Sequence, residues 1–319
     1  MTADKNALVG LDAIRAAAER IEPYIVKTSI VRMTPAGLRL KAENLQPVGA
    51  FKIRGAFNAI LSLNDNERER GVIAHSSGNH AQAVAYAAKK LGVKAVIVIP
   101  NNAPTIKVES TRRWGAEIHL VDFMDNARYE ICAELAERHG YVLVPPFDSM
   151  TIIAGTGTIG LEILAQNPDV EAIYVPVSGG GLISGVAAAI KQSNPAIRVI
   201  GVEPEFANDA QQSFRTGQIV SVPPEQTIHT AADGLRVSQL GKVPWAHVRA
   251  WVDDIVTVSE AQIEDAMRRI ATEARLIAEP SGAAAPAGAL LHAAKLETTV
   301  AILSGGNVDS ARYAAILAH

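Results

Sequence analysis

The chain has 319 residues, of which 48% are hydrophobic and 20% charged, and its 30 Lys+Arg against 33 Asp+Glu give a formal net charge of −3. No basic run or stripe stands out, so we expect no nucleic-acid partner. No apolar stretch reaches about 18 residues, so we expect no membrane span and no membrane partner. Residues 1–20 indicate an amphipathic helix and not a signal peptide. The single Cys132 excludes an intrachain disulfide, and together these features predict a cytoplasmic protein.

Short β-rich runs alternate with helical stretches along the chain. In chain order, the expected strand and helix pairs are 71–77 with 81–92, 94–100 with 105–115, 116–121 with 126–140, 172–177 with 183–192, and 198–204 with 207–217. The strand runs are almost continuously apolar, which is typical of parallel strands covered on both faces. Ser259 with Gln262 forms a capping box that predicts a helix over 263–274. The pattern indicates an α/β fold with parallel sheets.

Lys52 lies in an apolar segment, residues 49–56, that has a glycine at position 49 and another at position 55. Burial there would remove water from the ammonium group, lower its pKa and free the amine as a nucleophile. This is what a Schiff-base lysine needs. On this segment alone, a lysine at a helix start whose charged end stays in water is an equal alternative.

A serine followed by three glycines, at 178–181, connects the expected strand 172–177 to the expected helix 183–192. Glycines let the backbone turn tightly so that its N–H groups converge, and the helix N-terminus adds positive potential. The segment therefore predicts a cradle for a phosphate group. The alternative is a turn needed only for tight packing.

Four segments in this order resemble the PLP-dependent serine/threonine dehydratase family, which includes serine racemase. They are 38–56 with Lys52, Ser76 to His80, Ser178 to Leu182, and Ser304 to Asn307. The resemblance runs from about Thr28 to the last helix. It implies pyridoxal 5′-phosphate (PLP) as cofactor, a homodimer, and two parallel-sheet domains of the tryptophan synthase β-subunit-like (fold-type II) architecture. Residues 71–147 would form a small domain inserted into a large PLP-binding domain made of 1–70 and 148–319.

The resemblance also implies roles for individual residues. Lys52 would hold PLP covalently, Asn79 would meet its ring hydroxyl, and Ser304 would meet its ring nitrogen. Ser77 is the candidate acid/base on the face opposite Lys52. The full set of cofactor-binding residues is Phe51, Lys52, Asn79, Ser178, Gly179, Gly180, Gly181, Leu182, Ser304 and, as polar support, Glu279. The amino-acid substrate would bind at Ser76, Ser77, Gly78, Asn79 and His80, a segment that without the resemblance indicates only a capped helix start.

An acidic loop follows the expected strand 198–204. In some members of the family, an acid, a carbonyl four residues later and an acid six residues later bind a divalent cation. Glu203, the Ala207 carbonyl and Asp209 match this spacing. Oxygen ligands suit Mg²⁺, Ca²⁺ or Mn²⁺. The alternative is a solvated acidic loop.

Residues 155–160 fit the dinucleotide fingerprint G-x-G-x-x-G. That fingerprint also needs an acid about 20 residues later, where this chain has Ser178 and three glycines. We therefore predict close packing around a helix start and no nicotinamide site.

Two positions depart from the family pattern: Ala50 replaces a usual serine, and Thr156 replaces a frequent glutamine. The changes remove polar contacts and add room near the cofactor or substrate, which counts against plain serine or threonine as the preferred substrate and leaves a 3-substituted serine, such as 3-hydroxyaspartate or phenylserine, open. Because the chain ends at His319, we expect no fused regulatory domain.

The predicted activity is a PLP-dependent ammonia-lyase that converts a β-hydroxy amino acid (serine, threonine or a 3-substituted serine) to a 2-oxo acid and ammonia. A serine or aspartate-type racemase would use the same motifs. A non-catalytic α/β protein that binds a phosphate ligand is the alternative from another class.

Overall fold

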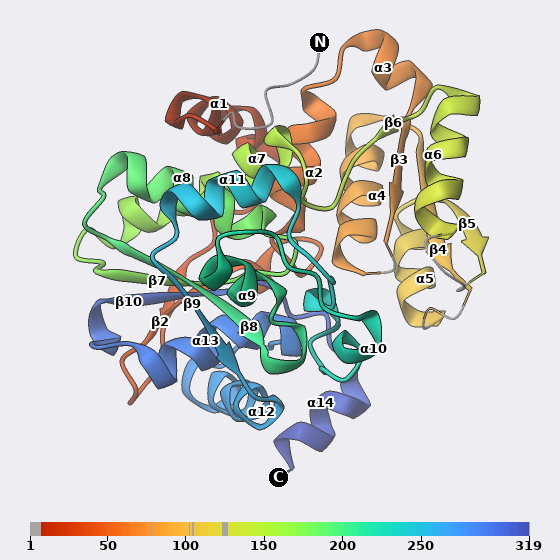
Figure 1. Ribbon diagram of the computed structural model, residues 1–319. Coiled ribbons are helices and arrows are strands. Elements are labelled where there is room, and N and C mark those ends of the chain that lie inside the picture. The colour runs from red at the N-terminus through yellow and green to blue at the C-terminus, as the bar shows by residue number, and fades with distance from the viewer. Residues whose placement is uncertain (1–7, 77, 102, 104, 123–126, 319) are drawn as a thin grey trace.

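The structure is a computed structural model that describes residues 8–76, 78–101, 103, 105–122 and 127–318. Within these residues the strands form two sheets, a six-stranded sheet of order β1-β2-β10-β7-β8-β9 and a four-stranded sheet of order β5-β4-β3-β6 (Figure 1). The strands are β1 Ile30–Arg32, β2 Arg39–Ala42, β3 Val72–His75, β4 Ala95–Pro100, β5 Glu117–Val121, β6 Val142–Leu143, β7 Ala172–Pro176, β8 Arg198–Pro204, β9 Asp254–Val258 and β10 Thr299–Leu303.

Helices surround both sheets. They are α1 Leu11–Ile21, α2 Lys52–Leu61, α3 Asp65–Arg70, α4 Asn79–Leu91, α5 Thr105–Arg113, α6 Ala127–His139, α7 Met150–Gln166, α8 Gly181–Ser193, α9 Asp209–Thr216, α10 Pro224–Thr227, α11 Lys242–Trp251, α12 Glu260–Arg269, α13 Pro280–His292 and α14 Ser310–Leu317. Ser259 and Gln262 form the predicted capping box of α12. The helix predicted over 263–274 continues past Arg269 as a π-helical segment, Ile270–Ala274. No helix in the described part of the chain is long and apolar enough to cross a membrane.

The smaller sheet is wholly parallel, and its two central strands β3 and β4 are apolar on both faces. Ile73, Val96 and Val98 pack with Cys132 and Leu135 of α6, so Cys132 is a buried, packed side chain. The alternate residues of β3 and β4 pack against α4 and α2 on the other face. Side chains alternate between faces along a strand, so covering both faces requires the continuous apolar runs seen in the sequence.

The larger sheet takes strands from both ends of the chain. All its neighbouring strands are parallel except β1, which pairs antiparallel with β2 at one edge. Helices α12 and α13 cover one face, and α7, α8 and α11 cover the other. The predicted fold class is therefore confirmed, with one antiparallel edge strand added.

The strands of the smaller sheet all lie between Val72 and Leu143. Helix α2 precedes this range but packs on the smaller sheet, where the Phe57 ring lies 6.0 Å from the Tyr86 ring of α4. We therefore keep the division into 71–147 and the combined 1–70 and 148–319 as a proposal, with α2 as the element between them.

The G-x-G-x-x-G segment lies in the middle of α7, which begins at Met150 behind the cap Ser149. The prediction of a helix start at these glycines was therefore wrong. The prediction of close packing is confirmed: a Cβ on Gly155 would lie 2.7 Å from the Arg54 carbonyl oxygen, and one on Gly157 would lie 2.9 Å from the Gly185 carbonyl oxygen. Helix α7 is thus held tightly between α2 and α8.

Candidate active site

Lys52 is the first residue of α2, and the segment before it is attached to the loop after β10. The Phe51 N–H donates to the Ser304 carbonyl at 3.0 Å, and the Gly306 N–H donates to the Gly49 carbonyl at 2.9 Å. The Lys52 side chain is partly buried, and its Nζ donates to the Pro146 carbonyl at 2.7 Å. Burial lowers the pKa of Lys52 to about 8. The site therefore holds an amine that loses its proton close to neutral pH.

His80, in the first turn of α4, is a buried neighbour of this amine. Its Nε2 lies 2.9 Å from the Val144 carbonyl oxygen, so Nε2 carries the proton and donates it. Burial, and then the positive charge of Lys52, lower the pKa of His80 to about 3. His80 is therefore a neutral imidazole at physiological pH.

The serine–glycine loop lies between β7 and α8, at the carboxyl edge of the larger sheet. Ser178 has a φ of 57° and Gly180 a φ of 88°, so two of its residues adopt left-handed backbone conformations. For a serine this conformation is strained, which is typical of a functional turn. The N–H groups in the first turn of α8 have no carbonyl in a preceding turn to bond. The loop can therefore bind an anion.

A cluster of amides and one carboxylate connects α4 with the large-sheet side of the site. Asn79 Nδ2 donates to Glu279 Oε1 at 2.6 Å, and Asn307 Nδ2 donates to Asn79 Oδ1 at 2.8 Å. The Glu279 N–H in turn donates to the Gly305 carbonyl at 3.1 Å. Ser304 is buried, and its hydroxyl lies 3.5 Å from the Ser281 carbonyl. The protein's own hydrogen bonds thus hold Asn79, Asn307 and Glu279 in place without a ligand.

The four sequence motifs thus converge on one place. The Lys52 segment pairs with the Ser304 loop, Asn79 reaches that loop through Glu279 and Asn307, and Phe147, next to the Pro146 carbonyl, lies against Gly179. Ser76 Oγ accepts a hydrogen bond from the Gly78 N–H at 3.2 Å, which shapes the turn before α4. Ser77, the predicted acid/base, lies outside the described residues.

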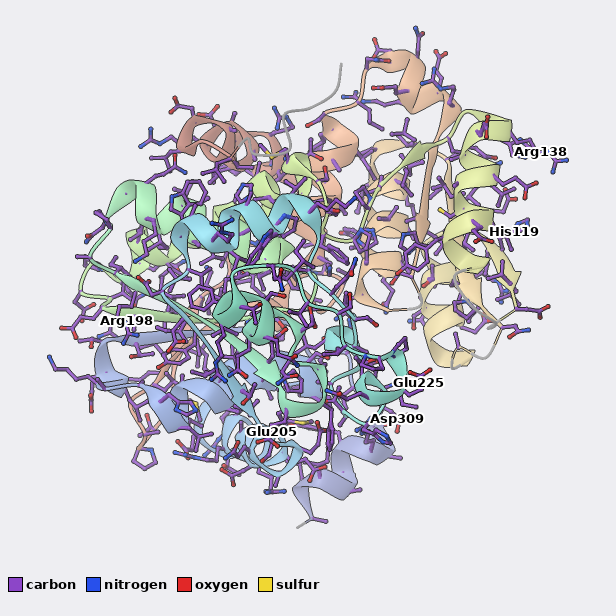
Figure 2. All side chains as sticks on the ribbon, in the orientation of Figure 1. His119, Arg138, Arg198, Glu205, Glu225 and Asp309 are labelled. Carbon is purple, nitrogen blue, oxygen red and sulfur yellow. The ribbon has the colours of Figure 1, made fainter. Side chains whose placement is uncertain are left out.

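Two buried carboxylates lie at the end of β8. Glu203 accepts hydrogen bonds from the Ala210 and Gln211 N–H groups at 3.3 and 2.8 Å. Neither carboxylate oxygen of Asp209 accepts one from another described residue. Burial raises the pKa of Asp209 to about 8, and burial together with the Asp209 charge raises that of Glu203 well above its usual range. Ala207, which lies between Glu203 and Asp209 in sequence, is also buried, whereas Glu205 is exposed (Figure 2).

No group of three or more His, Cys, Asp or Glu side chains among the described residues is arranged to hold a metal ion. The predicted ligand set contains only two such side chains, Glu203 and Asp209, because its third ligand is the backbone carbonyl of Ala207. Two desolvated acids, one with unused oxygens, form a donor set that suits a hard cation.

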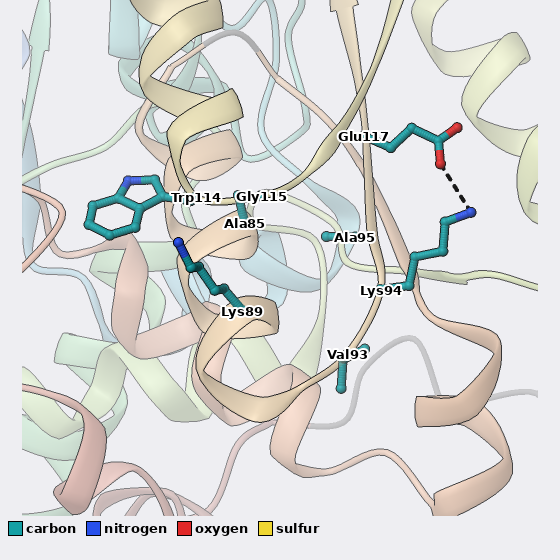
Figure 3. A pocket seen from close by; sticks show the side chains of 8 residues that line it. All are labelled: Ala85, Lys89, Val93, Lys94, Ala95, Trp114, Gly115 and Glu117. Atoms are coloured by element: carbon teal, nitrogen blue, oxygen red, sulfur yellow. Dashed lines mark ion pairs between the residues drawn. The ribbon is translucent and has the colours of Figure 1, made fainter.

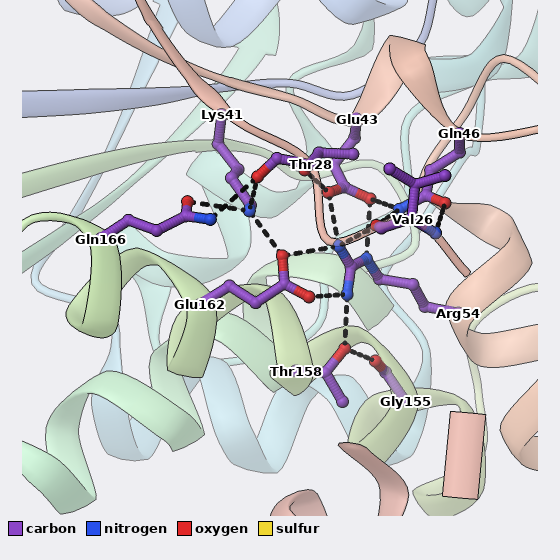
Figure 4. Close-up of polar contacts among 10 residues, drawn as sticks. All are labelled: Val26, Thr28, Lys41, Glu43, Gln46, Arg54, Gly155, Thr158, Glu162 and Gln166. Atoms are coloured by element: carbon purple, nitrogen blue, oxygen red, sulfur yellow. Dashed lines mark hydrogen bonds and ion pairs between the residues drawn. The ribbon is translucent and has the colours of Figure 1, made fainter. Parts of the chain in front are cut away.

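Arg54, two residues after Lys52 in α2, belongs to a buried ion cluster that joins α2 to α7 (Figure 4). The Arg54 guanidinium donates to both oxygens of Glu43 at 2.8 Å and to both oxygens of Glu162 at 2.7 and 3.0 Å. Lys41 Nζ also contacts Glu162 and donates to the Thr28 carbonyl at 2.6 Å. Two cations face two anions, so the cluster is neutral.

A hollow of about 260 Å³ lies elsewhere, on the smaller sheet near the ends of α4 and α5 (Figure 3). Its lining residues are Ala85, Lys89, Val93, Lys94, Ala95, Trp114, Gly115 and Glu117. None of them belongs to the four motifs, and Lys94 is already paired with Glu117 at 3.0 Å. It is not the candidate site.

Two features of the site escaped sequence analysis. The Pro146 carbonyl, which accepts from Lys52, is a backbone group and carries no signal in the sequence. Asn307 was part of a recognised motif, but its position two residues after Gly305 gave no hint that it would bond to Asn79, 228 residues away.

Comparison with known proteins decides the family. The sequence model of the protein family described as pyridoxal-phosphate dependent enzymes matches residues 21–305 of this chain. The chain belongs to this family of PLP-dependent enzymes. It is 44% identical to L-threo-3-hydroxyaspartate ammonia-lyase of Saccharomyces cerevisiae, covering 94% of each chain. It is also 44% identical to serine racemase of Oryza sativa, covering 94% of this chain and 91% of the relative. The structure of maize serine racemase superposes with a TM-score of 0.91 at 42% identity, covering 96% of each chain.

As a PLP-dependent enzyme, the chain falls among amino-acid dehydratases and racemases, which match it equally well. The described residues fit this cofactor. PLP carries an aldehyde and a phosphate monoester, and the site offers a partly buried amine whose pKa is lowered to about 8 and a serine–glycine loop at a helix N-terminus.

Proposed function

We propose that this chain is a PLP-dependent ammonia-lyase that converts a β-hydroxy amino acid to a 2-oxo acid and ammonia. The observation that carries the proposal is the Lys52 amine, which has a pKa lowered to about 8 and lies where the four motifs converge. When bound, PLP supplies an electron sink that stabilises negative charge at the substrate α-carbon. Lys52 then has two tasks: it attaches the cofactor, and it removes the α-proton.

The other residues bind and orient. Ser178 to Leu182, which include the start of α8, would hold the phosphate through N–H groups. Asn79, oriented by Glu279, would bond to the ring hydroxyl, and Ser304 to the ring nitrogen. Ser76, Gly78 and the N–H groups at the start of α4, Asn79 and His80 included, would receive the substrate carboxylate. Phe51 holds the Lys52 segment through its bond to the Ser304 carbonyl.

A lyase is favoured over a racemase by Ser304, the residue that would meet the ring nitrogen of the cofactor. Elimination needs one base and a departing β-hydroxyl, whereas racemisation also needs a proton donor on the opposite face. His80 is not the candidate for that donor, because burial lowers its pKa to about 3 and its N–H is bonded to the Val144 carbonyl, so Ser77 keeps this role by resemblance. Ser304 is a weaker partner for the ring nitrogen than a carboxylate, so a leaving group that drains the negative charge suits this site.

The racemase is the second candidate because a serine racemase matches the chain as closely as an ammonia-lyase does. By resemblance, Ser77 is the proton donor such an activity requires. We expect Ser77→Ala to abolish racemisation while some elimination persists from the enantiomer that Lys52 deprotonates. Product chirality and 2-oxo acid yield from each enantiomer, in wild type and Ser77→Ala, measure this. If wild type interconverts enantiomers much faster than it releases 2-oxo acid, the racemase replaces the lyase.

The substrate is proposed as a 3-substituted serine. The departure at Ala50 motivates this choice, as does the relative that is an L-threo-3-hydroxyaspartate ammonia-lyase. Thr156 does not add room for a substrate as the sequence predicted, because its side chain is buried and bonded to the Ile153 and Gly181 carbonyls. A screen of D- and L-serine, threonine, 3-hydroxyaspartate and phenylserine for 2-oxo acid release identifies the preferred one. A homodimer and a cytoplasmic location stay predictions.

We also propose that Glu203, the Ala207 carbonyl and Asp209 bind Mg²⁺, Ca²⁺ or Mn²⁺. Without a cation, the raised pKa values mean that the folded protein holds protons that the unfolded chain releases. This stabilises the fold at low pH, and the stabilisation is lost as the pH rises toward about 8, the pKa of Asp209. A bound cation would replace these protons and remove that loss.

In a melting experiment at about pH 8, we expect chelator to lower the melting temperature and each added cation to restore it by mass action, with a smaller difference at about pH 6. Asp209→Asn should abolish the response to cations. Glu205→Gln, which removes an exposed acid from the same loop, should leave it intact. Identical melting curves with chelator and with excess cation would exclude the site.

A further inference from the structure

Thr156 lies beneath the serine–glycine loop and is 1% exposed. Its Oγ1 lies 2.9 Å from the Gly181 carbonyl oxygen and 3.0 Å from the Ile153 carbonyl oxygen. The second contact, three residues back in α7, is common for a threonine in a helix. The first is different, because it joins α7 to the first residue of α8.

The Gly181 carbonyl and the Leu182 N–H are the two ends of one peptide group. A donor on the carbonyl draws electrons toward oxygen and makes the N–H at the other end a stronger donor. In a helix the carbonyl points along the chain and the N–H points back toward the helix start. The Leu182 N–H therefore faces the end of α8 at which an anion binds, on the side away from Thr156.

The contact is also rigid. A Cβ on Gly185 would collide with the Ile153 carbonyl and with Thr156 Oγ1, so α8 can approach α7 this closely only because residue 185 is glycine. The Thr156 hydroxyl thus lies where α7 and α8 are in contact, and its bond to Gly181 holds the start of α8 at a fixed distance from α7.

From this geometry we infer that Thr156 is a positioning residue for phosphate binding, which acts through the Gly181–Leu182 peptide without touching the ligand. The inference rests on the proposed function, in which the loop at 178–182 holds the phosphate of PLP. It assigns a use to a position where the sequence departs from its family pattern.

The test compares Thr156→Ala with Thr156→Ser, which differ by the hydroxyl oxygen alone. Ser184→Ala is a matched control, because it also removes a buried hydroxyl, in this case one on α8 that donates to the Pro244 carbonyl of α11 at 3.2 Å. For each full-length variant we would measure the apparent Kd for PLP and for pyridoxal, which lacks the phosphate, and the rise in melting temperature with inorganic phosphate alone.

We expect Thr156→Ala to weaken PLP binding about threefold and to reduce the melting response to phosphate, with pyridoxal binding unchanged. Thr156→Ser and Ser184→Ala should match wild type. Equal weakening for PLP and pyridoxal in Thr156→Ala, or no weakening for either, would overturn the inference. If wild type itself binds PLP no tighter than pyridoxal, the loop does not hold the phosphate, and the proposed function fails together with the inference.

Discussion

Lys52→Ala is expected to abolish turnover, with a loss of at least about a thousandfold, and to remove the visible absorption of the enzyme reconstituted with PLP. The variant loses both the amine that attaches the cofactor and the base that moves the α-proton. The fold should survive, because the change removes a partly buried cation whose solvation is already poor, as its pKa of about 8 indicates. Absorption spectra, 2-oxo acid release and melting temperature measure the three effects.

Lys89→Ala is the matched control, since Lys89 is an exposed lysine on α4, with its Nζ 5.8 Å from the centre of the Trp114 ring. It should keep both the colour and the activity. Substantial activity in Lys52→Ala would end the PLP assignment for this lysine. A colourless wild type that binds phosphate would favour the non-catalytic binding protein.

In wild type, attachment of PLP should speed up as the pH rises through about 8, because only the neutral amine of Lys52 reacts.

The alternation of strands and helices could be read from the sequence because buried parallel strands must be apolar on both faces. The convergence of the loops after β7 and β10 could also be anticipated, since loops at the carboxyl ends of parallel strands meet at one edge of a sheet, whereas the loop after β3 belongs to the other sheet and reaches them only through tertiary packing. Strands β1 and β2 could not be predicted in this way. They are short and contain Arg32, Arg39 and Lys41, so their place in the larger sheet depends on tertiary pairing and not on local pattern.

The start of α7 was misplaced for a related reason. Glycine at 155, 157 and 160 lowers the helix propensity of this segment and imitates a strand–helix turn. Packing overrides that preference: α7 needs residues without side chains where it meets α2 and α8. The Arg54 cluster was equally hidden, because its partners Glu43 and Glu162 are 11 and 108 residues away in sequence.

Arg54→Met is the substitution expected to cost the most stability, about 3–5 kcal/mol of the free energy of unfolding. Arg54 and Glu43 are both fully buried, and the arginine supplies bonds to both oxygens of Glu43 (Figure 4). Burial alone would raise the pKa of Glu43, but the charge and hydrogen bonds of Arg54, together with Lys41 and Thr28, outweigh it and hold the pKa below its usual range. Without Arg54, Glu43 and Glu162 would share the single charge of Lys41, which leaves one uncompensated negative charge in the interior.

The same reasoning predicts a recovery that distinguishes charge from packing. The double variant Arg54→Met, Glu43→Gln is again neutral, because Lys41 balances Glu162, so it should regain part of the lost stability. Urea unfolding midpoints measure both variants. Arg39→Met is the control for losing an arginine: its partner Asp169 is 55% exposed, and water screens such a pair, so its loss should change the unfolding midpoint little. Two results would contradict this reasoning: Arg54→Met lowering the unfolding midpoint no more than Arg39→Met does, or the double variant being less stable than Arg54→Met alone. Either would mean that an uncompensated buried charge is not the cause of the lost stability.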